Sequence, residues 1–171
     1  MNDEHLQDEE EDGAVAGEAG RRVPVVGIGA SAGGLEAIKE FLGALGDDLG
    51  ACLVVVQHLD PGHKSMLSEL LARCTKMPVR QAEQGMAIAA NEVVVIPPNS
   101  TLTRGDGAFR VERPAPPRLH RTPIDSLFRS LAKHEGTRAI AIVLSGTGSD
   151  GTQGMKEVKE AGGLVVSQFE F

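Results

Sequence analysis

Ser31, His58 and Asp150 are the residues of this 171-residue chain whose types and positions could activate a nucleophile. Ser31 lies in Gly29-Ala30-Ser31-Ala32-Gly33, which matches the nucleophile-elbow pattern G-x-S-x-G, where a tight turn exposes the serine hydroxyl. His58 comes soon after the apolar run 52–56, and Asp150 lies in a second glycine-rich segment, 146–151. An imidazole can accept the serine proton, and a carboxylate can orient the imidazole and stabilise its cation. Together the three residues would prepare a serine for attack on a carbonyl carbon.

Each of the three residues also has a purely structural explanation. A histidine at a strand end often only packs or faces solvent, and Asp150 precedes a predicted helix, where Asp is a favoured N-cap. None of the other histidines follows a predicted strand (His5, His63, His120 and His134). His58 is therefore the candidate base. The chain order Ser-His-Asp is no objection, because a triad is defined by its geometry.

The glycines around Ser31 fit a second pattern as well. Gly27, Gly29 and Ala32 match the dinucleotide fingerprint G-x-G-x-x-A, in which small residues let a pyrophosphate approach the backbone. A nicotinamide site would place Asp or Glu at the end of the next strand, to bind the ribose hydroxyls. Here that strand ends in Gln57-His58, and the nearest acid is Asp60 in an Asp-Pro-Gly turn. The segment leaves a serine hydrolase, a dinucleotide-binding oxidoreductase domain and a structural turn as alternatives.

Alternating strands and helices must position these residues. Apolar runs rich in β-branched residues predict buried strands at 23–28, 52–56, 93–96, 139–144 and 164–166. Apolar residues at helical spacing predict helices over 35–45, 66–74, 122–134 and 151–161, and residues 101–112 predict an antiparallel hairpin. We expect an α/β fold with a doubly wound, mostly parallel, Rossmann-like sheet and helices on both faces. In such sheets functional groups collect at the carboxyl ends of the strands, where all three candidates lie.

The acidic excess is concentrated in the first 22 residues. They hold eight of the 24 acidic residues and two of the 17 basic ones, with almost no large apolar side chain, which predicts a disordered acidic tail before one domain over residues 23–171. That near-neutral domain, without Trp or Tyr, gives little support for nucleic-acid binding. No apolar run is long enough to span a membrane, and a secretory signal pattern is absent. Cys52 and Cys74 form no metal-ligand pattern, so we expect a cytoplasmic protein with free thiols and no metal.

Three spaced motifs resemble those of the CheB-type chemotaxis methylesterases. They are the segment 29–34, Gln57-His58 and the segment 146–151, and the similarity covers about residues 23–168. The resemblance implies a protein-glutamate methylesterase, also able to act as a protein-glutamine glutaminase, that works on cytoplasmic helices of chemoreceptors without a cofactor. Position by position, it implies that Ser31 is the nucleophile, His58 the general base and acid, and Asp150 the orienting carboxylate.

Backbone amides are the expected stabilisers of the oxyanion that forms during this reaction. The candidates are the amides of Ala32, Gly33 and Thr147, although the resembled family commonly has Thr at the first position and Met at the third. An arginine-rich stretch is a candidate surface for an acidic receptor helix, or an ordinary solvated hairpin and loop. It contains Arg104, Arg110, Arg113, Arg118 and Arg121.

Both ends of the chain differ from the regulated members of the resembled family. The 22 residues of the acidic tail are too few for a phospho-acceptor domain, so we expect the usual phosphorylation control to be absent and the nearest analogues to be members fused to a receptor methyltransferase. The sequence stops before a further helix, which predicts uncovered apolar sheet surface. A catalytically silent receptor-binding module of the same fold is the alternative to the enzyme.

Overall fold

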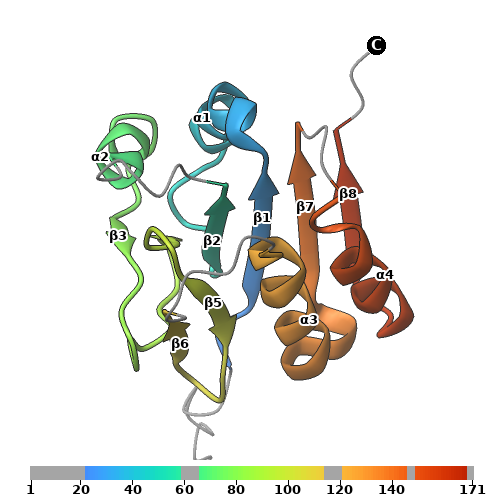
Figure 1. The fold of residues 1–171 in the computed structure, drawn as a ribbon. Coiled ribbons are helices and arrows are strands. Elements are labelled where there is room, and N and C mark those ends of the chain that lie inside the picture. Colours follow the sequence, from blue (N-terminus) through green and yellow to red (C-terminus); the bar gives the residue numbers. More distant parts are fainter. Residues whose placement is uncertain (1–21, 59–65, 114–120, 146–148, 169–171) are drawn as a thin grey trace, which may run out of the picture.

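Six parallel strands form the central sheet (Figure 1). The structure is a computed structural model and describes residues 22–58, 66–113, 121–145 and 149–168. The strands lie in the order β3-β4-β2-β1-β7-β8, and every neighbouring pair is parallel. Their bounds are β1 (Val25–Ala30), β2 (Cys52–Gln57), β3 (Val79–Gln81), β4 (Glu92–Val95), β7 (Ile140–Leu144) and β8 (Leu164–Ser167).

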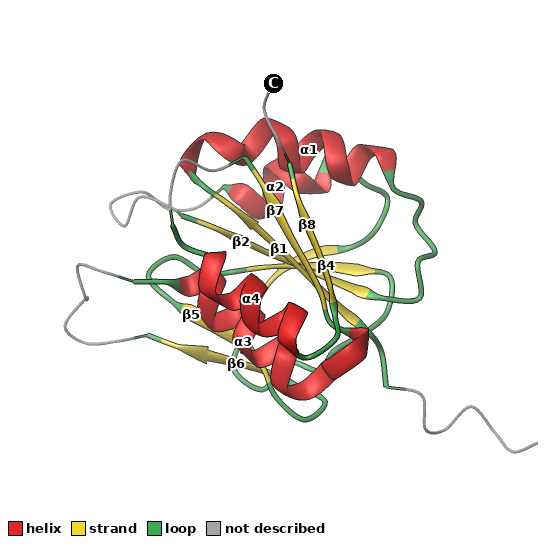
Figure 2. Ribbon diagram, turned by 90° about the vertical axis from the view of Figure 1, so that its right-hand side faces the viewer, coloured by secondary structure: helices red, strands yellow, loops and turns green. Residues whose placement is uncertain are grey.

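Helices cover both faces of this sheet, as Figure 2 shows. One face carries α1 (Leu35–Ala44) and α2 (Leu67–Ala72), and the other carries α3 (Pro123–Glu135) and α4 (Thr152–Glu160). An antiparallel hairpin, β5 (Thr101–Arg104) and β6 (Phe109–Glu112), lies on the same side as α3. Two single 3₁₀ turns, η1 (Ala32–Gly34) and η2 (Gly136–Arg138), precede α1 and β7. The predicted doubly wound α/β fold with a hairpin is confirmed.

The core consists of two apolar clusters, one on each face of the sheet. Alternate residues of β1 belong to different clusters: Val25 packs toward α3, while Val26 and Ile28 pack toward α1. β1 and β2 are buried along their whole length, which explains why their sequences are almost continuously apolar. The two strands that precede Ser31 and His58 are therefore packed on both faces.

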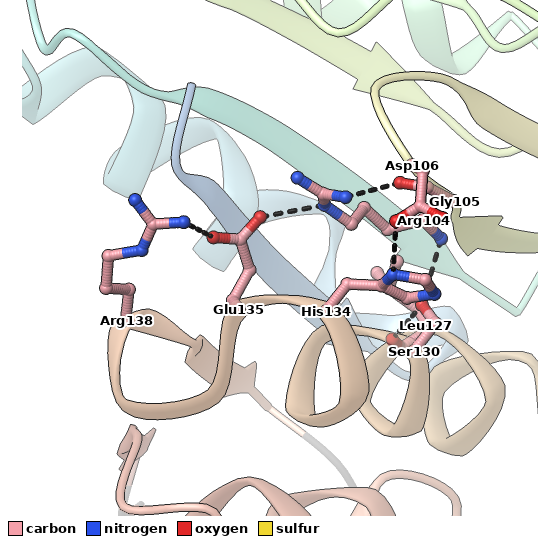
Figure 3. A network of polar contacts seen from close by, with 8 residues as sticks. All are labelled: Arg104, Gly105, Asp106, Leu127, Ser130, His134, Glu135 and Arg138. Carbon is pink, nitrogen blue, oxygen red and sulfur yellow. Dashed lines mark hydrogen bonds and ion pairs between the residues drawn. The ribbon is translucent and has the colours of Figure 1, made fainter. Parts of the chain in front are cut away.

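A buried ion pair fastens the hairpin to α3 (Figure 3). Arg104 Nε donates to Glu135 Oε1 at 2.7 Å, and the two side chains are 2% and 0% exposed. Arg138 Nη2 donates to the other oxygen of Glu135 at 3.2 Å, and the backbone amide of Arg104 donates to Ser130 Oγ at 2.9 Å. The inclusion of Arg104 in a receptor-facing basic surface was thus wrong, because this guanidinium is inside the protein and already paired.

Sequence patterns and structure differ at two further places. The short strand β3 was not predicted, because its three residues include one apolar side chain and are half-buried or exposed. In β8, Leu164 is 57% and Val166 42% exposed, so this edge of the sheet presents apolar side chains to solvent among the described residues. The predicted disordered tail lies almost entirely outside the described residues. Within the part of the chain that is described, no helix is long and apolar enough to cross a membrane.

Candidate active site

The three candidate residues follow three neighbouring strands. β1 lies between β2 and β7, and the last residue of β1, Ala30, is in register with Gln57 and with Leu144. Ser31 and His58 are the next residues of their strands, and Asp150 follows β7 after a short connection. The chain leaves β1 toward β2 by way of α1, and leaves β7 in the opposite direction by way of α4 on the other face. This is the switch point of the sheet, where open α/β folds place their sites.

His58 and Asp150 are in direct contact. The imidazole Nε2 lies 2.7 Å from Asp150 Oδ2, which is the distance of a charge-assisted hydrogen bond. The His58 side chain is 41% exposed, whereas that of Asp150 is 10% exposed. The carboxylate is thus held inside the protein while the imidazole faces the solvent edge of the sheet, where a substrate can reach it.

Asp150 is fixed by the first turn of α3. Its Oδ1 accepts from the amide of Asp125 at 2.9 Å, and its Oδ2 accepts from the amide of Ile124 at 3.1 Å. The N-cap residue of α3, Thr122, makes no capping bond with its side chain, so Asp150 takes over that role. The structural alternative for Asp150, that it caps the helix it precedes, was wrong, because the N-cap of α4 is Gly151 and Asp150 caps α3.

Ser31 lies beside this pair with its hydroxyl bonded elsewhere. Ser31 Oγ donates to the carbonyl oxygen of Ser145 at 3.2 Å, and the Ser31 amide donates to the same oxygen at 3.2 Å. Ser145 has a φ of +51°, a left-handed conformation that few residues other than glycine adopt. The structure therefore joins His58 to Asp150 and places Ser31 at the adjacent strand end. No sequence pattern indicates the Ser145 contact, since a lone serine after a strand has no distinguishing pattern.

Comparison with known proteins agrees with this geometry. The family description "CheB methylesterase" matches residues 26–170, which is most of the chain. The chain belongs to the CheB methylesterase family.

Several relatives named protein-glutamate methylesterase/protein-glutamine glutaminase support this membership. One from Anaeromyxobacter dehalogenans is 36% identical over 149 residues, covering 87% of this chain and 44% of the relative. One from Cupriavidus metallidurans is 38% identical over 145 residues, covering 84% of this chain and 43% of the relative. The CheB-family chain thus spans less than half the length of these relatives.

A solved structure shows the same fold. The crystal structure of the Thermotoga maritima CheB methylesterase catalytic domain superposes with a TM-score of 0.74 at 29% sequence identity. The match covers 84% of this chain and 78% of the Thermotoga chain. The predicted resemblance to the CheB catalytic domain is confirmed by both comparisons.

The glycines of this CheB-family strand are explained by helix packing. A Cβ atom on Gly27 would lie 2.8 Å from Leu131 Cδ1, and one on Gly29 would lie 2.5 Å from Ile124 Cγ2. Glycine at both positions therefore allows α3 to pack directly against the backbone of β1. The first two glycines of the dinucleotide fingerprint face a helix, so the fingerprint gives no support to the oxidoreductase alternative.

The predicted oxyanion candidates lie partly within the described residues. Ala32 and Gly33 form the start of η1, directly after Ser31, and the first amides of a helix have no partner within it. A Cβ atom on Gly34 would lie 2.6 Å from Ala30 Cβ, so glycine is needed there for the turn to fold back on β1. Thr147 lies outside the described residues. Among the residues described, no cluster of His, Cys, Asp and Glu has the arrangement of a metal site.

Proposed function

We propose that this chain is a protein-glutamate methylesterase catalytic domain that hydrolyses methyl esters of glutamate side chains on the cytoplasmic helices of chemoreceptors. The observation that carries the proposal is the 2.7 Å contact between His58 Nε2 and Asp150 Oδ2 at the strand ends beside Ser31. The family match and the names of the relatives support the choice of substrate. A location in the cytoplasm follows from the same proposal, because that is where these receptor helices are found.

Ser31 acts as the nucleophile in this proposal and His58 as the base. With Nε2 bonded to Asp150, Nδ1 is the ring nitrogen that accepts the hydroxyl proton once Ser31 rotates away from Ser145. The serine oxygen then bonds to the ester carbonyl carbon, and Asp150 stabilises the resulting imidazolium. The tetrahedral intermediate breaks its bond to the methoxy oxygen, which takes the proton from His58 and leaves as methanol.

Water completes the reaction. His58 removes a proton from water as the water oxygen attacks the acyl carbon, the bond to Ser31 Oγ breaks, and Ser31 regains its proton. The product is a glutamate carboxylate. A glutamine substrate follows the same course with ammonia as the leaving group, in keeping with the second activity in the names of the relatives. The residues need no cofactor for these steps.

The negative charge that forms on the carbonyl oxygen requires fixed donors. We propose the amides of Ala32 and Gly33, at the start of η1, and the amide of Thr147 for this role. The first two belong to the residues that directly follow the nucleophile, at the start of η1. Removal of one such donor typically slows a serine hydrolase by about 100- to 1000-fold.

Labelling with a fluorophosphonate tests the nucleophile and the base separately from the substrate. We expect the wild-type chain to react with the probe, Ser31→Ala to show no labelling, and His58→Ala to react at a strongly reduced rate. Labelling of Ser31→Ala at the wild-type rate would overturn the assignment of the nucleophile.

Methanol release from a methylated receptor fragment tests the substrate. We expect release by the wild-type chain and none by Ser31→Ala. Labelling without methanol release would favour a serine hydrolase of other specificity. Receptor binding with neither labelling nor release would establish the silent binding module.

A further inference from the structure

We propose that Asp125 is a positioning residue that holds Asp150, and through it His58, by clamping the turn between β7 and α4 against the start of α3. Asp125 does not touch the proposed nucleophile, and sequence patterns do not single it out. The inference rests on the proposed function only in so far as Asp150 orients a catalytic His58.

Asp125 contacts both the side chain and the main chain around Asp150. Its backbone amide donates to Asp150 Oδ1 at 2.9 Å. Its own Oδ1 accepts from the amide of Gly151 at 3.0 Å and from the amide of Gly154 at 2.7 Å. The amide of Gly151 belongs to the peptide that leaves Asp150. Asp125 thus fixes the orienting carboxylate from one side and the backbone that carries it from the other.

The two aspartates cap each other's helices. Asp150, in the turn before α4, satisfies amides in the first turn of α3, while Asp125, in the first turn of α3, satisfies amides at the start of α4. The N-cap residue of α4 is Gly151, which has no side chain to do this. A carboxylate at a helix N-terminus is favoured by the helix dipole as well as by its hydrogen bonds. The arrangement links the position of Asp150 to the relative position of two helices.

The clamp has little freedom to relax. Asp125 is 7% exposed. A Cβ atom on Gly154 would lie 2.6 Å from Phe128 Cβ and 3.0 Å from Asp125 Cα, so α4 approaches α3 as closely as glycine allows. Gly151 has a φ of +101°, which other residues rarely adopt. A side chain at position 125 that cannot accept hydrogen bonds from the amides of Gly151 and Gly154 would therefore displace the turn that carries Asp150.

The test compares Asp125→Asn, which keeps the accepting oxygen, with Asp125→Ala, which removes it. We expect Asp125→Ala to lower the maximal rate of labelling by a fluorophosphonate about 10- to 100-fold with little change in the half-saturating probe concentration, because small displacements of catalytic groups have effects of this size. Asp125→Asn should remain within about 3-fold of wild type, since its amide oxygen can cap α4. An equal loss in both variants would overturn the proposal.

A stability-matched control separates positioning from general destabilisation. Val158→Ala removes buried side-chain atoms from α4 without touching the clamp. At a temperature where all variants are folded, Val158→Ala should keep the wild-type labelling rate even if its melting temperature falls as far as that of Asp125→Ala. If both variants lose labelling equally, Asp125 serves the fold alone and the proposal fails.

A spectroscopic measurement keeps the inference testable if the esterase assignment is wrong. The ¹⁵N chemical shifts of His58 report which ring nitrogen carries the proton, and the contact with Asp150 favours a proton on Nε2 in the neutral ring. Asp125→Ala should shift His58 toward the other tautomer, whereas Asp125→Asn and Val158→Ala should not. Unchanged His58 shifts in Asp125→Ala would overturn the proposal. A changed tautomer in a wild-type chain that never labels would instead show that the proposed function alone is wrong.

Discussion

The hydroxyl of Ser31 donates to the carbonyl oxygen of Ser145 at 3.2 Å, across the boundary between β1 and β7. The same oxygen accepts from the Ser31 amide, so both donors of this serine point to one acceptor. Ser145 presents that oxygen from a left-handed backbone with φ of +51°. The resting position of the proposed nucleophile is therefore set by an unusual backbone conformation directly after the neighbouring strand, β7.

Substitution of Ser145 tests whether this conformation is required. Ser145→Gly should leave the free energy of unfolding within about 1 kcal/mol of wild type, because glycine adopts a left-handed conformation without steric penalty. Ser145→Val should lower it by about 2 kcal/mol, since a β-branched residue is disfavoured there, and should slow probe labelling. Urea unfolding and labelling rates measure the two effects. Equal stability of the two variants would show that residue 145 changes conformation freely.

Asp150 has two roles that separate in a second experiment. Asp150→Ala should abolish most probe labelling, with a loss of about 10⁴-fold, because the imidazole loses its orienting carboxylate. It should also lower the free energy of unfolding by about 1–2 kcal/mol, because the amides of Ile124 and Asp125 lose their acceptor. Ser31→Ala serves as the control, since it removes the nucleophile and leaves both amides bonded. An Asp150→Ala chain as stable as Ser31→Ala would contradict the capping role.

The sequence predicted the strands and the three candidate residues because both depend on local patterns. β-branched apolar runs identify β1, β2, β4 and β7, and the residues just after such runs must lie at the carboxyl edge of the sheet. This reasoning needs no knowledge of how the helices pack. The patterns predicted that His58 and Asp150 lie at the same edge of the sheet, and the two side chains are in contact although 92 positions separate them.

Features that depend on tertiary contacts were not predictable in this way. Asp150 precedes α4 in sequence, yet it caps α3, which becomes visible only once the two helices lie side by side. An arginine in a hairpin is usually exposed, but Arg104 is buried because it pairs with the carboxylate of Glu135, 31 positions later. The left-handed conformation of Ser145 is imposed by the surrounding structure and leaves no mark in the residue type.

Gly29 offers a test of the close packing between β1 and α3. Gly29→Ala should lower the free energy of unfolding by about 1–3 kcal/mol, because the added Cβ atom would lie 2.5 Å from Ile124 Cγ2. Gly33→Ala is the matched control, since a Cβ atom there meets nothing within 4 Å. Thermal or urea unfolding measures both. The double variant Gly29→Ala with Ile124→Ala should lose less stability than the sum of the two single variants.

The Cys52 thiol should make the folded protein less stable as the pH rises above about 9. Burial raises the pKa of the Cys52 thiol from 9.0 to about 12, with the charge of Glu92 adding to the effect and that of Arg80 opposing it. In the unfolded chain the thiol loses its proton above about pH 9, whereas in the folded chain it remains protonated. Unfolding therefore becomes easier as the pH rises from 9 toward 12, by about 1.4 kcal/mol per pH unit from this group.

Unfolding of Cys52→Ala checks this dependence. The free energy of unfolding of wild type should exceed that of Cys52→Ala by less at pH 10.5 than at pH 8. A Cys74→Ala control should follow the wild-type dependence of this free energy on pH more closely, because Cys74 is only half-buried. Iodoacetamide at pH 8 should modify Cys74 much faster than Cys52 in the folded protein. Rapid alkylation of Cys52 under these conditions would contradict the raised pKa.

Removing one partner of the buried pair Arg104–Glu135 should destabilise the protein strongly, whereas replacing both partners together should destabilise it much less. Arg104→Ala should lower the free energy of unfolding by about 3–5 kcal/mol, because the Glu135 carboxylate loses its main buried partner. The double variant Arg104→Met with Glu135→Leu should recover most of that loss, since it removes both buried charges and keeps similar volume. Arg110→Ala, at an exposed position of the same hairpin, should change stability by less than about 0.5 kcal/mol. If Arg104→Ala were as mild as Arg110→Ala, Arg104 would be exposed in solution and available to a receptor helix after all.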